Sequence, residues 1–182
     1  MFEAQFIDGV ILVQPKRFGD ERGYFCETYH LDRFDAAGVR GPFVQDNHSL
    51  SGARGVIRGL HFQVPPHAQA KLVRCTRGAI YDVAVDIRTG SSTYGNYVGA
   101  MLSAENGFQL YIPVGFAHGF CTLTEECEVQ YKVTDYYSPE CDQGLAWNDP
   151  EIGIDWPLDG ITPQLSDKDS RQPLLSGFQS PF

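Results

Sequence analysis

The stretch Ile80-Tyr-Asp-Val-Ala-Val-Asp-Ile87 carries a clear strand pattern, and the fold class can be argued from it. Its apolar residues recur at every second position, which places Tyr81, Val83 and Val85 on one face of a β-strand. Immediately before it, Arg77-Gly78 separates this run from another apolar run and predicts a hairpin connection. The centre of the chain is therefore predicted to form antiparallel β-structure.

Short runs of the same kind, separated by Gly, Pro and Asn, continue in both directions. They predict strands at residues 9–14, 24–29, 43–50, 55–63, 71–76, 79–88, 95–102, 109–112, 119–123 and 128–136. Helical patterns are few: residues 31–37 predict two turns that end at Gly38, and residues 103–106 predict one capped turn. The region after Asn148 is rich in Pro, Gly and Asp, which predicts irregular structure packed on the domain. Many short strands with few helices predict an antiparallel sandwich or barrel.

Length and composition narrow the possible classes of protein. A chain of 182 residues suits one domain with a substantial core, so we expect a single domain over residues 1–182. The net charge of −9 predicts that the protein binds neither nucleic acid nor anionic membranes. No apolar run reaches the roughly 18 residues of a membrane span, and no basic leader of a signal peptide is present, so we expect a soluble, cytoplasmic protein. The five cysteines include no Cys-x-x-Cys pair, which argues against a disulfide framework or a zinc knuckle.

Charge is unevenly distributed along the chain. No acidic residue occurs between Asn47 and Tyr81, whereas five basic residues fall in that interval. They are Arg54, Arg58, Lys71, Arg74 and Arg77. An acidic protein with one basic stretch suits a small anionic ligand such as a diphosphate. We expect at least two of these arginines to be solvated at strand ends instead.

Two spacings resemble the paired motifs of the cupin superfamily, whose fold is a jelly roll or double-stranded β-helix. The first is Gly55-Val-Ile-Arg-Gly-Leu-His-Phe-Gln63 followed by Lys71, and the second is Gly107-Phe-Gln-Leu-Tyr-Ile-Pro-Val-Gly-Phe-Ala-His118. In metal-binding cupins these motifs supply three histidines and a glutamate, but here Gln63 and Lys71 stand at two of the four positions. Because an ammonium group repels a cation, we expect no metal at this site.

The remaining residue types suit proton transfer. A histidine such as His61 can remove a proton from carbon. A fixed cation such as Lys71 can stabilise the enolate oxygen that forms when this carbon lies beside a carbonyl, an effect typically of about 3–4 kcal/mol. A phenol such as Tyr131 can return a proton from the opposite face. Together these groups suit inversion of a stereocentre next to a ketone.

A longer, ordered set of motifs resembles the dTDP-4-dehydrorhamnose 3,5-epimerase family. Examples are Arg58-Gly-Leu-His-Phe-Gln63 and Tyr131-Lys-Val-Thr-Asp-Tyr-Tyr137, and the matching segments run in order from about Phe18 to Asp169. The resemblance implies an all-β cupin jelly roll with a few short helices. It implies epimerisation at C3 and C5 of dTDP-4-dehydro-6-deoxy-D-glucose to give dTDP-4-dehydro-L-rhamnose, a step of dTDP-L-rhamnose biosynthesis, without a cofactor.

The resemblance also implies roles for individual residues. His61 matches the family's base, Tyr131 its proton donor and Lys71 the residue near the C4 oxygen, while Asp169 matches the carboxylate that orients the histidine. Tyr137 matches an aromatic residue that stacks on thymine. Further substrate contacts are matched by His118 and Lys168, and nucleotide-binding positions by Arg22, Glu27, Gln45, Asp46, Asn47 and Arg58. The fork of Arg58 suits a diphosphate, because a guanidinium can bind two oxygens at once.

The family is homodimeric, with an N-terminal strand exchanged between subunits, so the resemblance implies that Arg22 and Glu27 complete the neighbour's nucleotide site. Three alternatives stay open at this stage. The protein can be an epimerase of a single centre, C3 or C5; a metal-dependent cupin oxygenase or isomerase, against which Gln63 and Lys71 speak; or a non-catalytic nucleotide-sugar-binding protein. The sequence assigns no role to the segment after Ser170.

Overall fold

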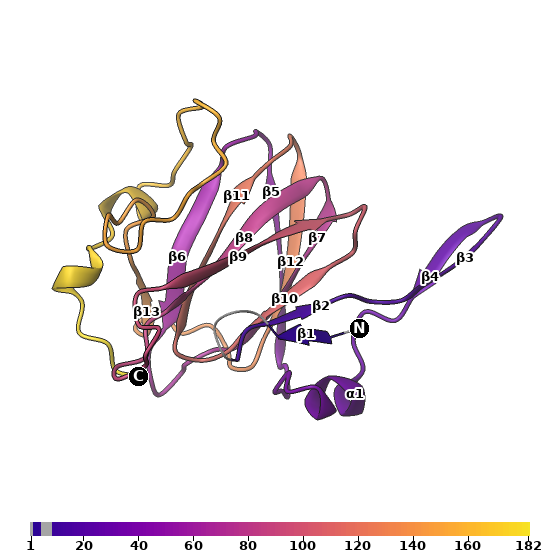
Figure 1. The fold of residues 1–182 in the computed structure, drawn as a ribbon, viewed down its shortest axis with the longest axis horizontal. Coiled ribbons are helices and arrows are strands. Elements are labelled where there is room, and N and C mark those ends of the chain that lie inside the picture. Colours follow the sequence, from indigo (N-terminus) through magenta and orange to yellow (C-terminus); the bar gives the residue numbers. More distant parts are fainter. Residues whose placement is uncertain (1, 5–8) are drawn as a thin grey trace.

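Two antiparallel β-sheets face each other and form the body of the molecule (Figure 1). The structure is a computed structural model, and it describes residues 2–4 and 9–182. The six-stranded sheet has the order β1 (Phe2–Ala4), β2 (Ile11–Val13), β10 (Gln109–Ile112), β7 (Lys71–Arg77), β12 (Cys127–Val133) and β5 (Gln45–Ser51). The five-stranded sheet has the order β13 (Asp142–Gly144), β6 (Ile57–Gln63), β11 (Phe116–Thr122), β8 (Ala79–Asp86) and β9 (Tyr97–Ser103).

The chain changes sheet at most of its connections. From β5 to β8 successive strands alternate between the two sheets, and the same alternation recurs from β9 to β13. This arrangement is the jelly roll that the sequence predicts, so the fold class is confirmed. Helices are few: α1 (Leu31–Ala36) and the two 3-10 helices η1 (Asp169–Arg171) and η2 (Leu175–Gly177).

Three apolar clusters hold the layers together. The first lies between the sheets and includes Val73 of β7, Ile80 and Ala84 of β8, and Leu110 of β10. The second lies on the outer face of the five-stranded sheet, where the C-terminal segment covers the β-strands; the third lies where α1 packs on the six-stranded sheet. The C-terminal segment therefore covers the outer face of the five-stranded sheet, and α1 covers part of the outer face of the six-stranded sheet.

The strand β8 is buried on both faces. Val83 and Val85 pack against the C-terminal segment, as the alternating pattern predicts for one face. The other face carries Asp82 and Asp86, and both are fully buried. Polar residues in an alternating strand usually mark the solvent side, but here they point into the sandwich. Asp86 is held there by Arg88 and two hydroxyl groups, and Asp82 belongs to the site described below.

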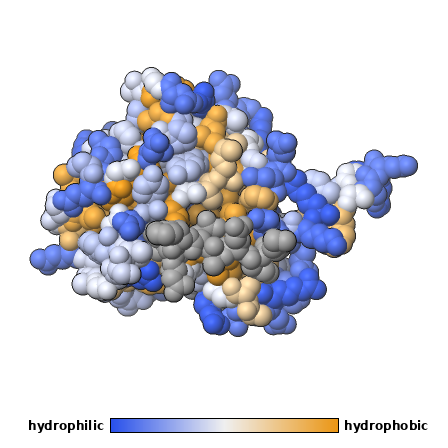
Figure 2. Space-filling model, in the orientation of Figure 1, coloured by the Kyte–Doolittle hydropathy of each residue, from blue (hydrophilic) through white to orange (hydrophobic). Residues whose placement is uncertain are grey.

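Several short strands depart from the prediction. A single strand was expected at residues 24–29, but β3 (Arg17–Asp20) and β4 (Gly23–Cys26) form a separate two-stranded hairpin. The hairpin projects from the body (Figure 1), and Figure 2 shows it as a largely hydrophilic arm standing clear of the rest. It nevertheless exposes three aromatic side chains, Phe18, Tyr24 and Phe25, at 54%, 60% and 70%. The three-residue strands β1 and β13 were also not predicted, because such short strands are specified by their pairing partners rather than by a local pattern.

No helix in the part of the chain that the structure describes is long and apolar enough to cross a membrane.

Candidate active site

The two motif histidines lie side by side on neighbouring strands. β6 pairs with β11, and His61 stands directly opposite His118 in this register. The two strands approach closely at Gly59, where a side-chain carbon would lie 2.5 Å from the backbone of Gly119. Glycine is therefore required at this crossing, and it lets both histidines face the space between the sheets.

A cavity of about 490 Å³ opens in front of these histidines. Its wall includes seven of the predicted site residues: Arg58, His61, Lys71, His118, Tyr131, Lys168 and Asp169. A second hollow of about 270 Å³ shares His61, Lys71, Tyr131 and Lys168 with it and adds Gln45, Asn47 and Tyr137. Ten of the thirteen site residues predicted from the sequence therefore line these two adjoining spaces.

His61 is held by a carboxylate from a distant part of the chain. Its Nε2 lies 2.5 Å from Oδ1 of Asp169 in η1, and the Asp169 backbone N–H donates to the Ser166 hydroxyl. Asp169 is 4% exposed, whereas the His61 side chain is 31% exposed toward the cavity. Burial raises the pKa of Asp169, but the hydrogen bond and charge of His61 outweigh it and hold the pKa below its ordinary value. The carboxylate is therefore ionised and can stabilise a positively charged imidazole.

Lys71 lies on the opposite sheet and reaches across to the strand of His61. Its Nζ donates to the His61 carbonyl oxygen at 3.3 Å, and the residue is only 9% exposed. Burial lowers the pKa of Lys71 to about 8, against the attraction of Asp142 and Asp82. A lysine in this state is still a cation at neutral pH, and its N–H groups can bind an oxygen that gains negative charge.

Tyr131 approaches the cavity from β12 of the six-stranded sheet, so it faces His61 from the other layer. Its ring packs against the cluster between the sheets. Burial raises the pKa of its phenol, with Arg58 opposing the shift. The phenol therefore keeps its proton at neutral pH and can act as an acid.

His118 forms a second histidine–aspartate pair. Its Nε2 lies 2.8 Å from Oδ1 of Asp82, and the two side chains are 7% and 0% exposed. Burial lowers the pKa of His118, outweighing the attraction of Asp82. The sequence singled out His118 as a substrate contact but did not identify Asp82. The available signal was the acidic residue in an otherwise apolar alternating strand.

Two positions that hold metal ligands in metal-binding cupins carry Gln63 and Lys71 here. Gln63 binds backbone groups of the loop before β13 and of the β6–β7 connection, and Lys71 occupies the glutamate position as an ammonium. Among the side chains that the structure describes, no three His, Cys, Asp or Glu residues gather in a way that could hold a metal ion.

Three of the six nucleotide-binding candidates, Arg58, Gln45 and Asn47, form a polar rim around the adjoining spaces. Arg58 donates to the Ser51 hydroxyl and to the Leu50 carbonyl, each at 3.1 Å. Gln45 donates to Asn47 at 2.9 Å and accepts from the Tyr137 backbone N–H at 3.1 Å. These contacts fix the side chains of Arg58, Gln45 and Asn47 along β5, and they tie Gln45 to the backbone of the loop that carries Tyr137.

Asp142 connects two further candidates and was not among the predicted residues. Its Oδ2 accepts from the Tyr137 hydroxyl at 3.1 Å and from Lys168 Nζ at 2.5 Å. The hydrogen bond to Asp142 raises the pKa of the Tyr137 phenol. A loosely patterned loop gives no sequence signal for such a link, because the three residues belong to three separate segments.

Three predicted residues are not brought to the cavity within this chain. Asp46 lies on the outer face of the six-stranded sheet, where Lys132 donates to it at 2.8 Å, because successive residues of β5 point to opposite faces. Arg22 stands at the turn of the projecting hairpin and pairs with Asp20. Glu27 follows the hairpin and pairs with Arg33 at 2.7 Å.

The basic stretch divides as expected. Arg58 and Lys71 line the cavity, whereas Arg54 and Arg77 are more exposed and pair with acidic side chains. Arg74 lies on the outer face of the six-stranded sheet, where it donates to Gln130. Two cations of this stretch are therefore available for an anion in the cavity.

Comparison with known proteins agrees with this geometry. The family model for dTDP-4-dehydrorhamnose 3,5-epimerase matches residues 4–177. A dTDP-4-dehydrorhamnose 3,5-epimerase from Sinorhizobium fredii is 55% identical over 174 residues, which cover 96% of this chain and 89% of the relative. A dTDP-4-dehydrorhamnose 3-epimerase from Streptomyces niveus is 42% identical over 171 residues, covering 93% of this chain and 81% of the relative.

A solved structure shares the architecture almost completely. It is dTDP-6-deoxy-D-glucose-3,5-epimerase from Legionella pneumophila, crystallised in complex with dTDP-4-keto-L-rhamnose. The similarity has a TM-score of 0.93 at 45% sequence identity, and covers 98% of this chain and 94% of that chain.

Proposed function

The chain belongs to the dTDP-4-dehydrorhamnose 3,5-epimerase family, and we propose that it performs this reaction with His61 as base, Tyr131 as acid and Lys71 as the oxyanion donor. The protein is an isomerase that acts on dTDP-4-dehydro-6-deoxy-D-glucose and yields dTDP-4-dehydro-L-rhamnose. The single observation that carries the residue assignment is the placement of His61 and Tyr131 on opposite sheets of one cavity.

The first half of each inversion is removal of a proton from carbon. The ketone at C4 makes the hydrogens at C3 and C5 acidic, because the electron pair left on carbon moves onto the C4 oxygen. With Nε2 of His61 engaged by Asp169, Nδ1 is the nitrogen left to take the proton. Asp169 stabilises the imidazolium that forms, and Lys71 stabilises the enolate oxygen.

The second half returns a proton to the other face of the ring. Tyr131 reaches the sugar from the sheet opposite His61, so its phenol O–H can protonate the carbon that His61 has deprotonated. The carbon–hydrogen bond re-forms with inverted configuration. The proton on His61 and the one missing from Tyr131 are then exchanged with solvent, which prepares the site for the second centre.

The adjoining hollow suits the nucleotide. Gln45 and Asn47 line this hollow, and Arg58, in the wall of the larger cavity beside it, provides two-point binding for the diphosphate. Tyr137 presents an aromatic ring that is 58% exposed and can stack on thymine. His118 and Lys168 line the wall on the sugar side.

We further propose a homodimer whose projecting hairpins complete each other's nucleotide sites. Arg22 is 89% exposed on the arm, and three aromatic side chains of the arm stand in solvent in the single chain. Such exposed aromatic residues favour contact with a second protein surface. Arg22 and Glu27 would then reach the partner's cavity.

The five cysteines support a cytoplasmic location, because all of them are free thiols. Free thiols are usual in reducing compartments, where disulfides rarely persist.

The test of the reaction is turnover in heavy water with dTDP-4-dehydro-6-deoxyglucose. NMR should detect deuterium at both C3 and C5, and a reductase should trap the L-rhamnose product. Deuterium at one carbon alone would assign the activity to a single-centre epimerase, as in the Streptomyces niveus relative. Absence of deuterium at either carbon would contradict the proposal.

The test of the shared site is complementation between two inactive variants. Co-expressed Arg22→Ala and His61→Ala chains form mixed dimers in which one site has an intact His61 and receives an intact Arg22. In a random mixture half of the dimers are mixed, so activity should reach about a quarter of the wild-type value. Activity no higher than that of the two separate variants would contradict a site built from both subunits.

A further inference from the structure

Gln63 stands two residues beyond His61 on β6, so both side chains leave the strand on the same side. It is 4% exposed, although glutamine is rarely buried to this degree. A buried amide must satisfy its two donors and its acceptor within the protein. The partners of Gln63 therefore indicate what the residue holds in place.

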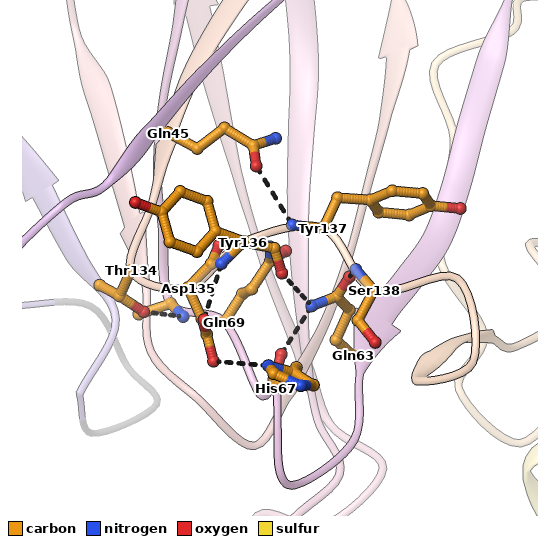
Figure 3. Close-up of polar contacts among 10 residues, drawn as sticks. Gln45, Gln63, His67, Gln69, Thr134, Asp135, Tyr136, Tyr137 and Ser138 are labelled. Carbon is orange, nitrogen blue, oxygen red and sulfur yellow. Dashed lines mark hydrogen bonds and ion pairs between the residues drawn. The ribbon is translucent and has the colours of Figure 1, made fainter.

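All three polar functions of the Gln63 amide bind backbone groups outside its own strand, as Figure 3 shows. Its nitrogen donates to the His67 carbonyl at 2.6 Å and to the Tyr136 carbonyl at 3.1 Å. Its oxygen accepts from the Ser138 N–H at 2.8 Å. Two of these three backbone groups flank Tyr137 directly, one on each side.

Tyr137 itself has little packing to fix its ring. The residue is 58% exposed, and its hydroxyl contacts Asp142, which also binds Lys168. Its backbone, in contrast, is held at three points: the Tyr137 N–H donates to Gln45, and the Tyr136 carbonyl and the Ser138 N–H bind Gln63. The position of the ring is thus set by its backbone, and Gln63 ties this backbone to the strand of His61.

A second set of contacts holds the start of the same loop, at Asp135. Gln69 donates to the Asp135 carbonyl at 2.7 Å, and His67 Nδ1 lies 3.2 Å from the Asp135 carboxylate. These contacts reach the loop two residues before Tyr137. They hold its base, whereas Gln63 holds the two peptide groups beside the ring (Figure 3).

We propose that Gln63 is a positioning residue for nucleotide recognition, which fixes the ring of Tyr137 at a set distance from His61. The inference rests on the proposed function, in which Tyr137 stacks on thymine. A ring held in its binding position before the ligand arrives loses no freedom on binding. Without Gln63 two peptide groups beside Tyr137 lose their partners, so the loop must rearrange to find water or other groups.

The decisive probe is a pair of ligands that share the diphosphate. Nucleoside diphosphate dTDP uses both Tyr137 and the phosphate-binding residues, whereas inorganic pyrophosphate uses only the latter. Gln63→Met keeps the length of the side chain and removes its polar atoms. By titration calorimetry it should weaken dTDP about tenfold and leave pyrophosphate within about twofold. KM for the nucleotide sugar should rise about tenfold with kcat within about twofold.

Gln143→Met is the matched control, because Gln143 lies on the adjacent β13 opposite Phe62 and is exposed. It should change neither affinity. Equal weakening of dTDP and pyrophosphate by Gln63→Met would reduce Gln63 to a structural role and overturn the inference. Unchanged dTDP affinity would overturn it as well.

A double-mutant cycle tests whether Gln63 acts through the ring. In a Tyr137→Ala background, Gln63→Met should weaken dTDP no further, since the positioned ring is already absent. Additive losses would contradict the inference.

A second variant covers the case in which Gln63→Met does not fold. Gln69→Met should weaken dTDP binding about threefold and leave pyrophosphate binding unchanged. An unchanged dTDP affinity would overturn the inference. Failure of the proposed function is separate, because the wild-type protein would then bind dTDP no better than pyrophosphate.

Discussion

Two histidine–aspartate pairs have their histidines opposite each other on β6 and β11 of one sheet, and they differ in their access to the cavity. In the first, His61 is 31% exposed and its carboxylate partner comes from the C-terminal segment. In the second, His118 is 7% exposed and its partner Asp82 comes from the neighbouring strand β8. The hydrogen-bond distances are similar, 2.5 Å and 2.8 Å.

This difference in exposure suggests different roles: His61 exchanges protons with the substrate, whereas the buried His118–Asp82 pair acts through the charge of Asp82. A base must reach the substrate and become charged during the reaction, which the open pair allows. Burial instead lowers the pKa of His118 and keeps it neutral at neutral pH. The second oxygen of Asp82 is buried and accepts no hydrogen bond from the described residues. Its charge acts on Lys71, whose pKa it raises.

The largest expected effect comes from removing the two histidines in turn. His61→Asn should lower kcat by about 10³-fold or more, because the proton acceptor is lost. His118→Asn should also lower kcat, but the loss should be at least tenfold smaller than for His61→Asn, because the buried imidazole takes no proton from the substrate. Steady-state assays and deuterium incorporation at C3 and C5 measure both. Equal losses in the two variants would remove the distinction between the pairs.

Lys71→Met should reduce kcat by about 10²–10³-fold through loss of the oxyanion donor. The same variant should be more stable at pH 7. The pKa of Lys71 falls from 10.5 to about 8 on folding, so burying the charged form opposes folding by roughly 3 kcal/mol below pH 8.

Thermal unfolding at two pH values tests this second effect. As pH rises from 8 toward 10.5 the folded state releases the proton before the unfolded state does, so wild-type stability gains on the variant. The difference in Tm between Lys71→Met and wild type should therefore be large at pH 7 and small at pH 10. A variant less stable than wild type at pH 7 would contradict the destabilising role of the charge.

Asp169→Asn should lower kcat about 100-fold, because the amide cannot stabilise the imidazolium of His61 as a carboxylate does. Nucleotide binding should stay near the wild-type value by calorimetry, since Asp169 contacts His61 rather than the nucleotide rim. The comparison predicts a smaller loss for Asp82→Asn, whose partner is the buried histidine. A larger loss for Asp82→Asn would reverse the roles assigned to the pairs.

Sequence patterns were sufficient for the sandwich but not for its attachments. The alternation around Val83 identified β8, and apolar runs located most of the other strands, because side-chain burial in a sheet repeats every two residues. The hairpin β3–β4 was only partly predicted. It has no buried face in the single chain, so no alternation marks it.

The candidate site divides in the same way. His61 and Lys71 could be located because they fall on motifs at fixed spacing within strands. The partner of His61 lies 108 residues away in an irregular segment, and only the family resemblance suggested Asp169. Asp82 and Gln63 lie in segments that the sequence marked, but their partners lie on other strands and loops, so the sequence pattern did not indicate their roles.

The smallest expected effect is a shift in the alkaline limb of the pH profile. Activity should fall as pH rises through about 8, because Lys71 loses its proton there. Burial raises the pKa of the Tyr131 phenol, so this group stays an acid over the same range.

The charges near Lys71 set where this limb lies. Besides burial, Asp142 and Asp82 raise the pKa of Lys71, and Lys168 lowers it. Asp82→Asn removes one of the two attractions and should move the limb to lower pH, by less than about one unit. Asp169→Asn should leave the limb in place, because Asp169 is not among the charges that act on Lys71. Profiles of kcat between pH 6 and 10 for the two variants make the comparison. If Asp169→Asn rather than Asp82→Asn shifted the alkaline limb, the His61–Asp169 pair would be the one that sets the pKa of Lys71.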